Sequence, residues 1–283
     1  ASLSAADGGS RTISVAAASA GAFTLTGGTG KDTLTGGDGA DIINGGSSDD
    51  IITGGKGDDI ITGGTGVDTF NVDVGTDTIT DLGGSSGGES DKLIISKDAT
   101  VKATVSVSFI ATSDTLNHVD NAVTKAIIST DTDGATIDMS AASAGVFTLT
   151  GNDGVDKLTG GAGADTIDGG KGDDIITITT AGHGDTDVMD GGVGADVLQL
   201  STGKHTFADD GKLKNIETIK TAAGGSEVIL EKQKEALEIT GGDGVDKVTG
   251  GEGIDTIDGG KGCLLYTSPS PRDKGQDRMP CSA

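Results

Sequence analysis

The first 262 residues of this 283-residue chain contain no cysteine, no proline and no tyrosine, and the whole chain contains no tryptophan. The lack of cysteine excludes disulfides and thiolate metal sites from this region, and it leaves the redox compartment open. Aromatic residues make up only 2% of the chain, which excludes an ordinary core of large side chains. No apolar run reaches the roughly 18 residues that a membrane-spanning helix needs, so we expect no membrane span.

Acidic residues and glycine dominate instead. The chain has 44 Asp and Glu against 20 Lys and Arg, a formal net charge of −24, and 51 glycines. The excess of acid argues against nucleic acid or an anionic membrane as a partner. This composition is typical of a disordered chain, or of a fold that uses glycine for its turns and a cation to neutralise its acids.

A nine-residue repeat decides between these two interpretations. Five units follow one another from Gly27, namely GGTGKDTLT, GGDGADIIN, GGSSDDIIT, GGKGDDIIT and GGTGVDTFN. Each unit has aspartate at its sixth position and an apolar residue at its eighth, a phase that a flexible linker has no reason to keep. Similar units recur from Gly151, where four extra residues interrupt them, and from Gly241. The sixth-position aspartates are Asp32, Asp41, Asp50, Asp59, Asp68, Asp156, Asp165, Asp174, Asp187, Asp196, Asp246 and Asp255.

The repeats divide the chain into blocks and spacers. The predicted division is a lead segment with a strand (1–26), block 1 (27–82), a Thr/Ser-rich spacer (83–150), block 2 (151–200), a second spacer (201–240) and a truncated block 3 (241–262). We expect both spacers to be rich in β-strand, because stretches such as 92–112 and 215–221 alternate apolar with polar residues.

The spacing predicts a coil of two units. Glycines at the start of each unit allow a turn, and the last three residues allow a short strand with one side chain pointing inward. Coils of 18 residues place strands of successive coils about 4.8 Å apart. Aspartates 18 residues apart then stack at one edge, as in the pairs 32/50, 50/68, 41/59 and 156/174. The four-residue insertion leaves the other pairs of block 2 open, and Leu264 stands where block 3 would need its next aspartate.

Stacked carboxylates repel one another unless a cation lies between them. Ca²⁺ accepts carboxylates together with backbone carbonyls, whereas Mg²⁺ demands a tighter octahedron and Zn²⁺ prefers His or Cys. The residues therefore favour calcium ions as the cofactor and as the principal partner.

These units closely resemble the RTX (repeats-in-toxin, haemolysin-type) calcium-binding nonapeptide GGxGxDxUx. The resemblance implies an all-β fold, a calcium-bound parallel β-roll or solenoid, with the twelve aspartates as metal ligands helped by turn carbonyls. It also implies export, mostly by type I secretion from Gram-negative bacteria, and an extracellular or cell-surface location. We expect the chain to be unfolded where calcium is scarce and to fold on binding it outside the cell.

Several blocks with spacers favour a structural or adhesive surface protein, similar to surface-layer proteins or secreted adhesins, and not an enzyme. The alternative is the calcium-binding carrier region of a secreted protease, lipase or toxin. Self-association, a surface polysaccharide and a neighbouring surface protein stay open as partners. The G-x-S-x-G at 83–87 lies in a Gly/Ser linker, and STDTDG at 129–134 lacks the acidic ends of a calcium loop. His118, His183 and His205 lie far apart in the sequence, so we expect surface roles for them.

The third GGKG continues differently, as CLLYTSPSPRD. Every cysteine, proline and tyrosine of the chain lies after Gly262. Bases that encode this stretch resemble a transposase end and adapter used in DNA library preparation. We therefore interpret 263–283 as a translated sequencing adapter, with no disulfide or metal role expected for Cys263 and Cys281.

Overall fold

The computed structural model is all-β wherever it describes the chain. It describes residues 1–4, 8–17, 21–83, 91–96, 99–105, 108–111, 116–117, 125–130, 134–142, 145–179, 186–207, 209–267 and 274–276. Two compact units divide the chain, 1–148 and 149–283. Among the described residues, no helix is long and apolar enough to cross a membrane.

The strands are short, and their pairing within each unit is parallel. The strands of the first unit are β1 (Ser2–Ser4), β2 (Thr12–Ser14), β3 (Thr24–Gly28), β4 (Thr33–Thr35), β5 (Ile42–Ser47), β6 (Ile51–Thr53), β7 (Ile60–Thr65), β8 (Thr69–Val72), β9 (Gly75–Ile79), β10 (Lys92–Ile95), β11 (Ala99–Val105), β12 (Ser108–Ile110), β13 (Leu116–Asn117), β14 (Lys125–Thr130) and β15 (Thr136–Asp138). The strand β16 (Phe147–Thr150) runs across the division between the units.

The strands of the second unit follow in the same style. They are β17 (Lys157–Thr159), β18 (Thr166–Asp168), β19 (Ile175–Ile178), β20 (Val188–Asp190), β21 (Val197–Leu200), β22 (Gly203–Thr206), β23 (Leu213–Lys214), β24 (Thr218–Thr221), β25 (Ser226–Ile229), β26 (Glu238–Thr240), β27 (Val245–Thr249), β28 (Thr256–Asp258), β29 (Cys263–Thr267) and β30 (Lys274–Gln276).

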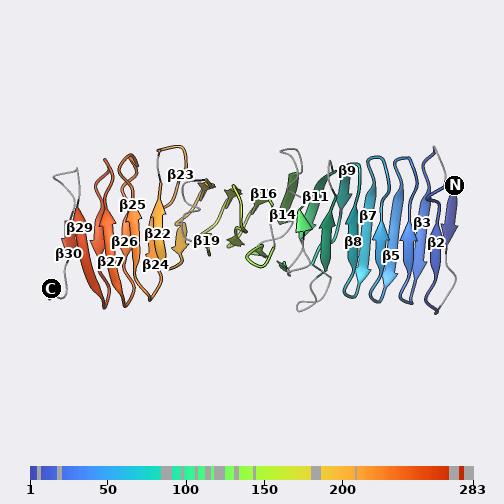
Figure 1. The fold of residues 1–283 in the computed structure, drawn as a ribbon, viewed down its shortest axis with the longest axis horizontal. Coiled ribbons are helices and arrows are strands. Elements are labelled where there is room, and N and C mark those ends of the chain that lie inside the picture. Colours follow the sequence, from blue (N-terminus) through green and yellow to red (C-terminus); the bar gives the residue numbers. More distant parts are fainter. Residues whose placement is uncertain are drawn as a thin grey trace. The chain divides into compact units, whose positions relative to one another are not determined.

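Successive nonapeptides contribute strands alternately to two sheets. In the first unit one sheet has the order β1-β3-β5-β7-β9-β11-β14 and the other β2-β4-β6-β8-β10-β13, and Figure 1 shows these strands side by side. Register advances by 18 residues, as where Ile43 faces Ile61 and Leu34 faces Ile52. The predicted parallel solenoid of two-unit coils is therefore confirmed.

The core is the column of eighth-position side chains. Leu34, Ile43, Ile52, Ile61 and Phe70 are all at most 1% exposed. Each strand is too short to contribute more than one or two inward side chains, so burial is built up by stacking coils and not within any single coil. The eighth position of the repeat therefore specifies the core of each roll.

Spacer segments add coils to the rolls. In the first unit β10 pairs with β8, and β11 pairs with β9, so 92–105 continues the sheets of block 1. In the second unit β24 joins β21 to β26, and β25 joins β22 to β27. The β-strands predicted for the spacers are confirmed, and they extend the same solenoid within each unit.

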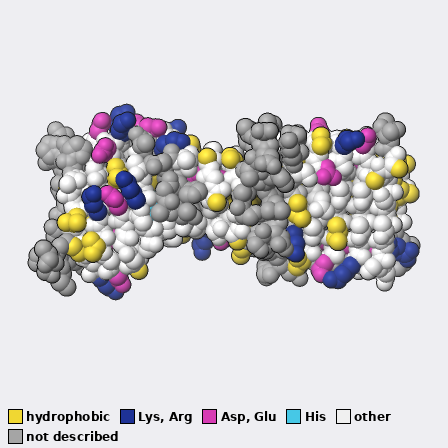
Figure 2. All heavy atoms as spheres, in the orientation of Figure 1, with side chains coloured by type: hydrophobic (Ala, Val, Ile, Leu, Met, Phe, Trp, Pro, Cys, Tyr) yellow, Lys and Arg dark blue, Asp and Glu magenta, His cyan; other side chains and the backbone are white. Residues whose placement is uncertain are grey.

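The outer faces of the block 1 sheets carry few charges. Figure 2 shows only scattered acidic side chains on the visible surface, although the net charge is −24. Seventh-position Ile42, Ile51 and Ile60 point outward and are about half exposed, at 50%, 47% and 46%. The sixth-position aspartates do not contribute to the surface, because they are buried.

The first glycine of each unit lies where coils touch most closely. A Cβ at Gly36 would lie 2.0 Å from the Gly54 carbonyl oxygen of the next coil and 2.5 Å from Asp41 Oδ2. Gly36→Ala would force the coils apart and break ladder hydrogen bonds. We expect it to lower the free energy of unfolding in calcium by about 3 kcal/mol or more, measured by urea denaturation. Gly9→Ala is the control, because nothing lies within 4 Å of that Cβ position, and equal losses for both variants would contradict this packing.

The segment after Gly262 continues the roll. β29 pairs with β27, with Leu264 opposite Asp246 and only 6% exposed. Leu264 thus occupies the sixth position of its unit, where the repeat elsewhere places an aspartate. Cys263 is disulfide-bonded, so the expectation that it forms no disulfide is wrong for this structure. The chain's other cysteine, Cys281, lies outside the described residues.

Candidate metal centre

The sixth-position carboxylates form ladders along the edges of the rolls. Asp32 N–H donates to Asp50 Oδ1 at 2.7 Å, Asp50 N–H donates to Asp68 Oδ1 at 2.8 Å, and Asp41 N–H donates to Asp59 Oδ1 at 2.8 Å. Each aspartate therefore joins two coils, with its amide bonded to the carboxylate of the coil that follows. The predicted stacking of aspartates 18 residues apart is confirmed.

Block 2 keeps this arrangement across its insertion. Asp156 N–H donates to Asp174 Oδ1 at 2.8 Å over 18 residues. Beyond the insertion the ladder resumes over 22 residues, from Asp165 to Asp187 at 2.9 Å and from Asp174 to Asp196 at 2.8 Å. The pairs that the sequence left open are therefore in register. In block 3, Asp246 Oδ1 accepts from the Ser226 amide and Asp255 Oδ1 accepts from the Leu237 amide, both in the spacer.

The second carboxylate oxygen lies inside the turn. In some units it accepts an amide of its own turn, as where Gly37 N–H donates to Asp41 Oδ2 at 2.8 Å. Elsewhere it is buried and accepts no hydrogen bond. This holds, among the described residues, for the Oδ2 atoms of Asp32, Asp50, Asp59, Asp77, Asp174 and Asp196. A buried carboxylate oxygen without a donor is costly unless a cation neutralises it.

Turn carbonyls accompany these oxygens. The position of a Cβ at Gly27 would be 2.0 Å from the Gly45 carbonyl oxygen and 2.7 Å from Asp32 Oδ2. In block 2, a Cβ at Gly169 would be 2.3 Å from the Gly191 carbonyl oxygen and 2.6 Å from Asp174 Oδ2. Carboxylate and carbonyl oxygens thus converge at the turns of both units. Oxygen-only donors of this kind are what Ca²⁺ binds.

No group of three or more acidic, His or Cys side chains suited to a metal ion occurs among the described residues. A bound cation would therefore need backbone carbonyls in addition to the carboxylates of neighbouring coils. The residues present fit that mixed ligand set, and the role of the twelve aspartates as calcium ligands stays a prediction. When bound, calcium would supply the positive charge that the turns lack.

Burial changes the acidity of the ladder. Desolvation raises the pKa of Asp50, Asp59 and Asp174 from 3.8 to about 6, and a hydrogen bond from the preceding coil's backbone only partly offsets this. Desolvation likewise raises the pKa of Asp68 and Asp77 to about 7. Neighbouring aspartates add to each increase. Without calcium, the folded chain therefore holds protons that the unfolded chain releases.

This shift predicts an unusual pH dependence for the calcium-free chain. A carboxyl group whose folded pKa lies above its unfolded value stabilises the fold fully below pH 4 and loses that contribution as the pH rises through 6 to 7. In EDTA, the β-sheet circular dichroism signal is therefore expected to grow as the pH falls from 8 to 5. A signal that weakens over this range would contradict the assignment of the buried carboxylates.

Three ladder members were not predicted from the sequence. Asp77 lies in 72–80, a unit that lacks its first two glycines, and its Oδ1 accepts from the Asp59 amide at 3.0 Å. Asp91 follows after 23 residues and accepts from the Asp68 amide at 2.9 Å. Glu217 takes the next position after Asp196, whose amide donates to Glu217 Oε2 at 2.7 Å. The apolar residues Ile79, Leu93 and Ile219, each two positions after one of these acids, are the signal that could have revealed them.

Other candidate residues do not join this site. His205 is fully buried on β22, and its Nε2 lies 2.9 Å from the Ser201 carbonyl oxygen, so the surface role expected for it is wrong. His118 and His183 lie outside the described residues, as do most of the G-x-S-x-G at 83–87 and part of STDTDG at 129–134. The turns remain the one arrangement of chemically distinctive groups that recurs along the described chain.

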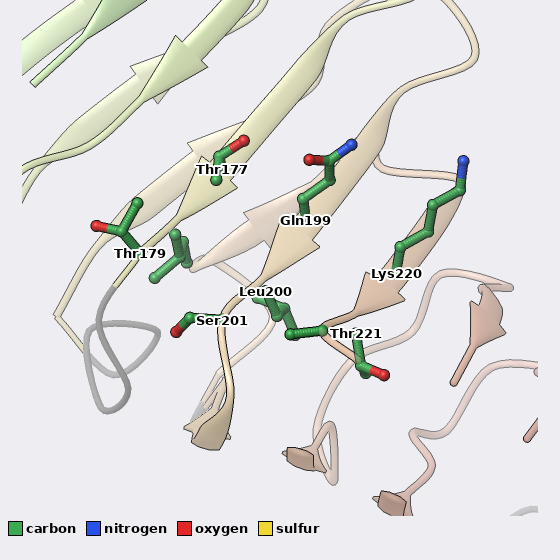
Figure 3. Close-up of a pocket in the computed structure, with 9 residues that line it drawn as sticks. Thr177, Thr179, Gln199, Leu200, Ser201, Lys220 and Thr221 are labelled. Atoms are coloured by element: carbon green, nitrogen blue, oxygen red, sulfur yellow. The ribbon is translucent and has the colours of Figure 1, made fainter. Parts of the chain in front are cut away.

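A shallow pocket lies at the ends of β19, β21 and β24 in the second unit (Figure 3). Its volume is about 530 Å³. Thr177, Gln199 and Lys220 lie in register on the three strands, and the buried Ile178 and Leu200, whose side chains point to the opposite face of the sheet, also line it. The pocket thus combines hydroxyl, amide and ammonium groups with apolar surface, and it lacks the carboxylates of the turns.

The geometry defines a class of protein, a parallel β-solenoid whose turns collect buried carboxylate and carbonyl oxygens. The family model for the RTX calcium-binding nonapeptide repeat (four copies) matches residues 24–52, 44–79, 148–177, 181–198 and 240–262. The chain therefore carries RTX calcium-binding nonapeptide repeats over these residues, and its predicted fold class, a β-roll, is confirmed. No curated protein and no solved structure matched the chain.

Proposed function

We propose that this chain is a structural or adhesive component of a bacterial surface, surface-layer-like and without enzymatic activity, which folds on binding calcium after export. RTX repeats imply calcium binding and a family exported by type I secretion. The observation that carries the proposal is the continuity of the coils. Spacer strands such as β10 and β24 extend the rolls within each unit and do not form a separate domain beside them.

Calcium provides the switch in this proposal. Without it, the free-energy cost of burying the ladder carboxylates exceeds the stabilisation from the one or two inward side chains of each strand, so the chain stays unfolded in a calcium-poor cytosol. Extracellular calcium modules bind at about 10⁻⁴–10⁻³ M, a range that is met outside cells. Folding then follows export and produces a stiff element suited to a surface.

Two kinds of partner are supported by particular features. Self-association is supported by the neighbouring, half-exposed Ile42 and Ile60 on the uncharged face of β5 and β7. A surface polysaccharide is supported by the row of Thr177, Gln199 and Lys220 at the pocket, whose hydroxyl, amide and ammonium groups can bond to sugar hydroxyls.

Sedimentation velocity and negative-stain microscopy of the purified full chain test the structural role. We expect assemblies in millimolar calcium that dissolve in EDTA, or calcium-dependent binding to purified cell-envelope polysaccharide. A chain that stays monomeric and binds no envelope material in calcium would contradict the proposal.

The alternative, a carrier region of an exported enzyme or toxin, makes a different prediction about the flanking gene sequence. An upstream H-E-x-x-H or a strand-borne G-x-S-x-G would favour a protease or lipase. Further alternation of roll blocks and spacers would favour the surface role.

A further inference from the structure

Three units carry a second aspartate at position five, directly before the ladder aspartate. They are the units of Asp49, Asp58 and Asp173. The fifth position of the RTX repeat is not restricted, and other units place Lys31, Ala40 or Val67 there.

Each position-five carboxylate accepts a hydrogen bond from the coil that follows, whereas the ladder carboxylate beside it accepts one from the coil that precedes. Asp49 Oδ1 accepts from the Val67 amide at 3.1 Å, Asp58 Oδ1 from the Thr76 amide at 2.9 Å and Asp173 Oδ1 from the Ala195 amide at 2.9 Å. All three donors belong to the coil that follows. In the same units, the ladder aspartate accepts from the coil that precedes. A doubled aspartate therefore holds the coils on both sides of it.

Two of the three doubled aspartates face irregular coils. Asp58 bonds to the unit 72–80, which lacks the first two glycines of the repeat. Asp173 bonds across the four-residue insertion of block 2, 22 residues to Ala195, and Asp174 spans the same gap to Asp196. The extra acceptor is thus placed where glycine spacing alone does not fix the register.

We propose that the position-five aspartates are positioning residues that hold the next coil in register for the calcium turns, and that they are not calcium ligands. Unlike the ladder aspartates, they are exposed or half-exposed side chains on the outside of the turn. In Asp58 and Asp173 a carboxylate oxygen acts as a hydrogen-bond acceptor for a backbone amide, a role that does not require a charge, whereas Asp49 also forms an ion pair with Lys31 of the preceding coil. This inference rests on the calcium-coupled folding proposed above.

The pair of variants Asp58→Asn and Asp58→Ala separates a hydrogen-bond acceptor from a ligand. Asn keeps an acceptor oxygen and loses the charge, whereas Ala loses both. In the full chain we expect Asn to fold at the wild-type calcium midpoint and Ala to raise that midpoint, by up to about fivefold, which is the effect of one lost hydrogen bond when folding takes up a single ion and is smaller when it takes up several. Equilibrium dialysis should give the same number of bound calcium ions for all three proteins, and the Thr76 amide should exchange faster only in Ala.

Asp38→Ala is the matched control, because Asp38 is a partly exposed aspartate of the same block whose carboxylate pairs with the Lys56 side chain. If Asn is as damaging as Ala and a calcium ion is lost, Asp58 is a ligand and the proposal is wrong. If Ala is as silent as Asp38→Ala, Asp58 positions nothing and the proposal is also wrong.

Asp173→Ala and Asp173→Asn repeat the test in the second unit, should Asp58→Ala fail to fold. A wild-type chain whose folding ignores calcium would overturn the proposed function instead. The Asn and Ala variants of Asp58 and of Asp173 would then be compared by urea denaturation. We still expect the free energy of unfolding of each Asn variant to equal that of wild type and to exceed that of the Ala variant.

Discussion

Chelating calcium with excess EDTA at pH 7.5 is expected to abolish most of the β-sheet circular dichroism signal of the chain. The rolls bury a column of carboxylates at the edges of their coils, from Asp32 through Asp50 to Asp68 in block 1. Each coil buries little apolar surface to offset that cost, because a strand contributes only one or two inward side chains. The fold therefore depends on the cation, as small metal-dependent domains do.

Adding calcium back should restore the signal cooperatively. Magnesium at the same concentration is the control, because it prefers a tight octahedral shell and keeps its waters, and it should restore far less. Retention of the full β-sheet signal in EDTA at pH 7.5 would show that the rolls are stable without a metal. The role of calcium in the fold would then be wrong.

Asp59→Ala is expected to have the second large effect. Asp59 lies between Asp41 and Asp77 in its ladder, so its loss leaves the buried Asp41 amide without an acceptor. It also removes the carboxylate oxygen that lies beside Gly54 in the turn of its own coil. We expect the free energy of unfolding in calcium to fall by about 3 kcal/mol or more, measured by urea denaturation.

The control for Asp59→Ala is Asp38→Ala, which removes only an exposed ion pair with Lys56 and should cost no more than about 1 kcal/mol. Asp59→Asn adds a sharper contrast, because it keeps the acceptor and removes the buried charge. It should weaken calcium binding and yet make the calcium-free fold more stable than wild type in EDTA at pH 7.5. Equal calcium affinity in Asp59→Asn and wild type would exclude Asp59 as a ligand.

The sequence was sufficient to predict the coil, because inward apolar residues and stacked aspartates share one 18-residue period. Ile43 and Ile61, and Asp41 and Asp59, are neighbours for that reason. Prediction failed where the glycine pattern stopped but the register continued. Asp77 and Asp91 were missed because an inward residue and a carboxylate suffice to hold a coil, whether or not the turn begins with two glycines.

The remaining differences depend on length and context. Glu217 was missed because a longer carboxylate can serve the same amide from a less regular coil. His205 was expected at the surface because a lone histidine carries no sign of burial in the sequence. Leu264 shows the converse, since an apolar residue takes an aspartate position at the edge of block 3. In each case the neighbouring coil determines the environment of the side chain, and the local sequence alone does not predict it.

Amide hydrogen exchange of the full chain during a calcium titration tests the central claim most directly. The amides of Asp32, Asp41, Asp156 and Asp165 each donate to a ladder carboxylate of the following coil. We predict that they are unprotected in EDTA at pH 7.5 and become protected as calcium is added, in step with the number of ions bound. Protection of these amides without calcium, or ion binding that leaves them unprotected, would contradict the account.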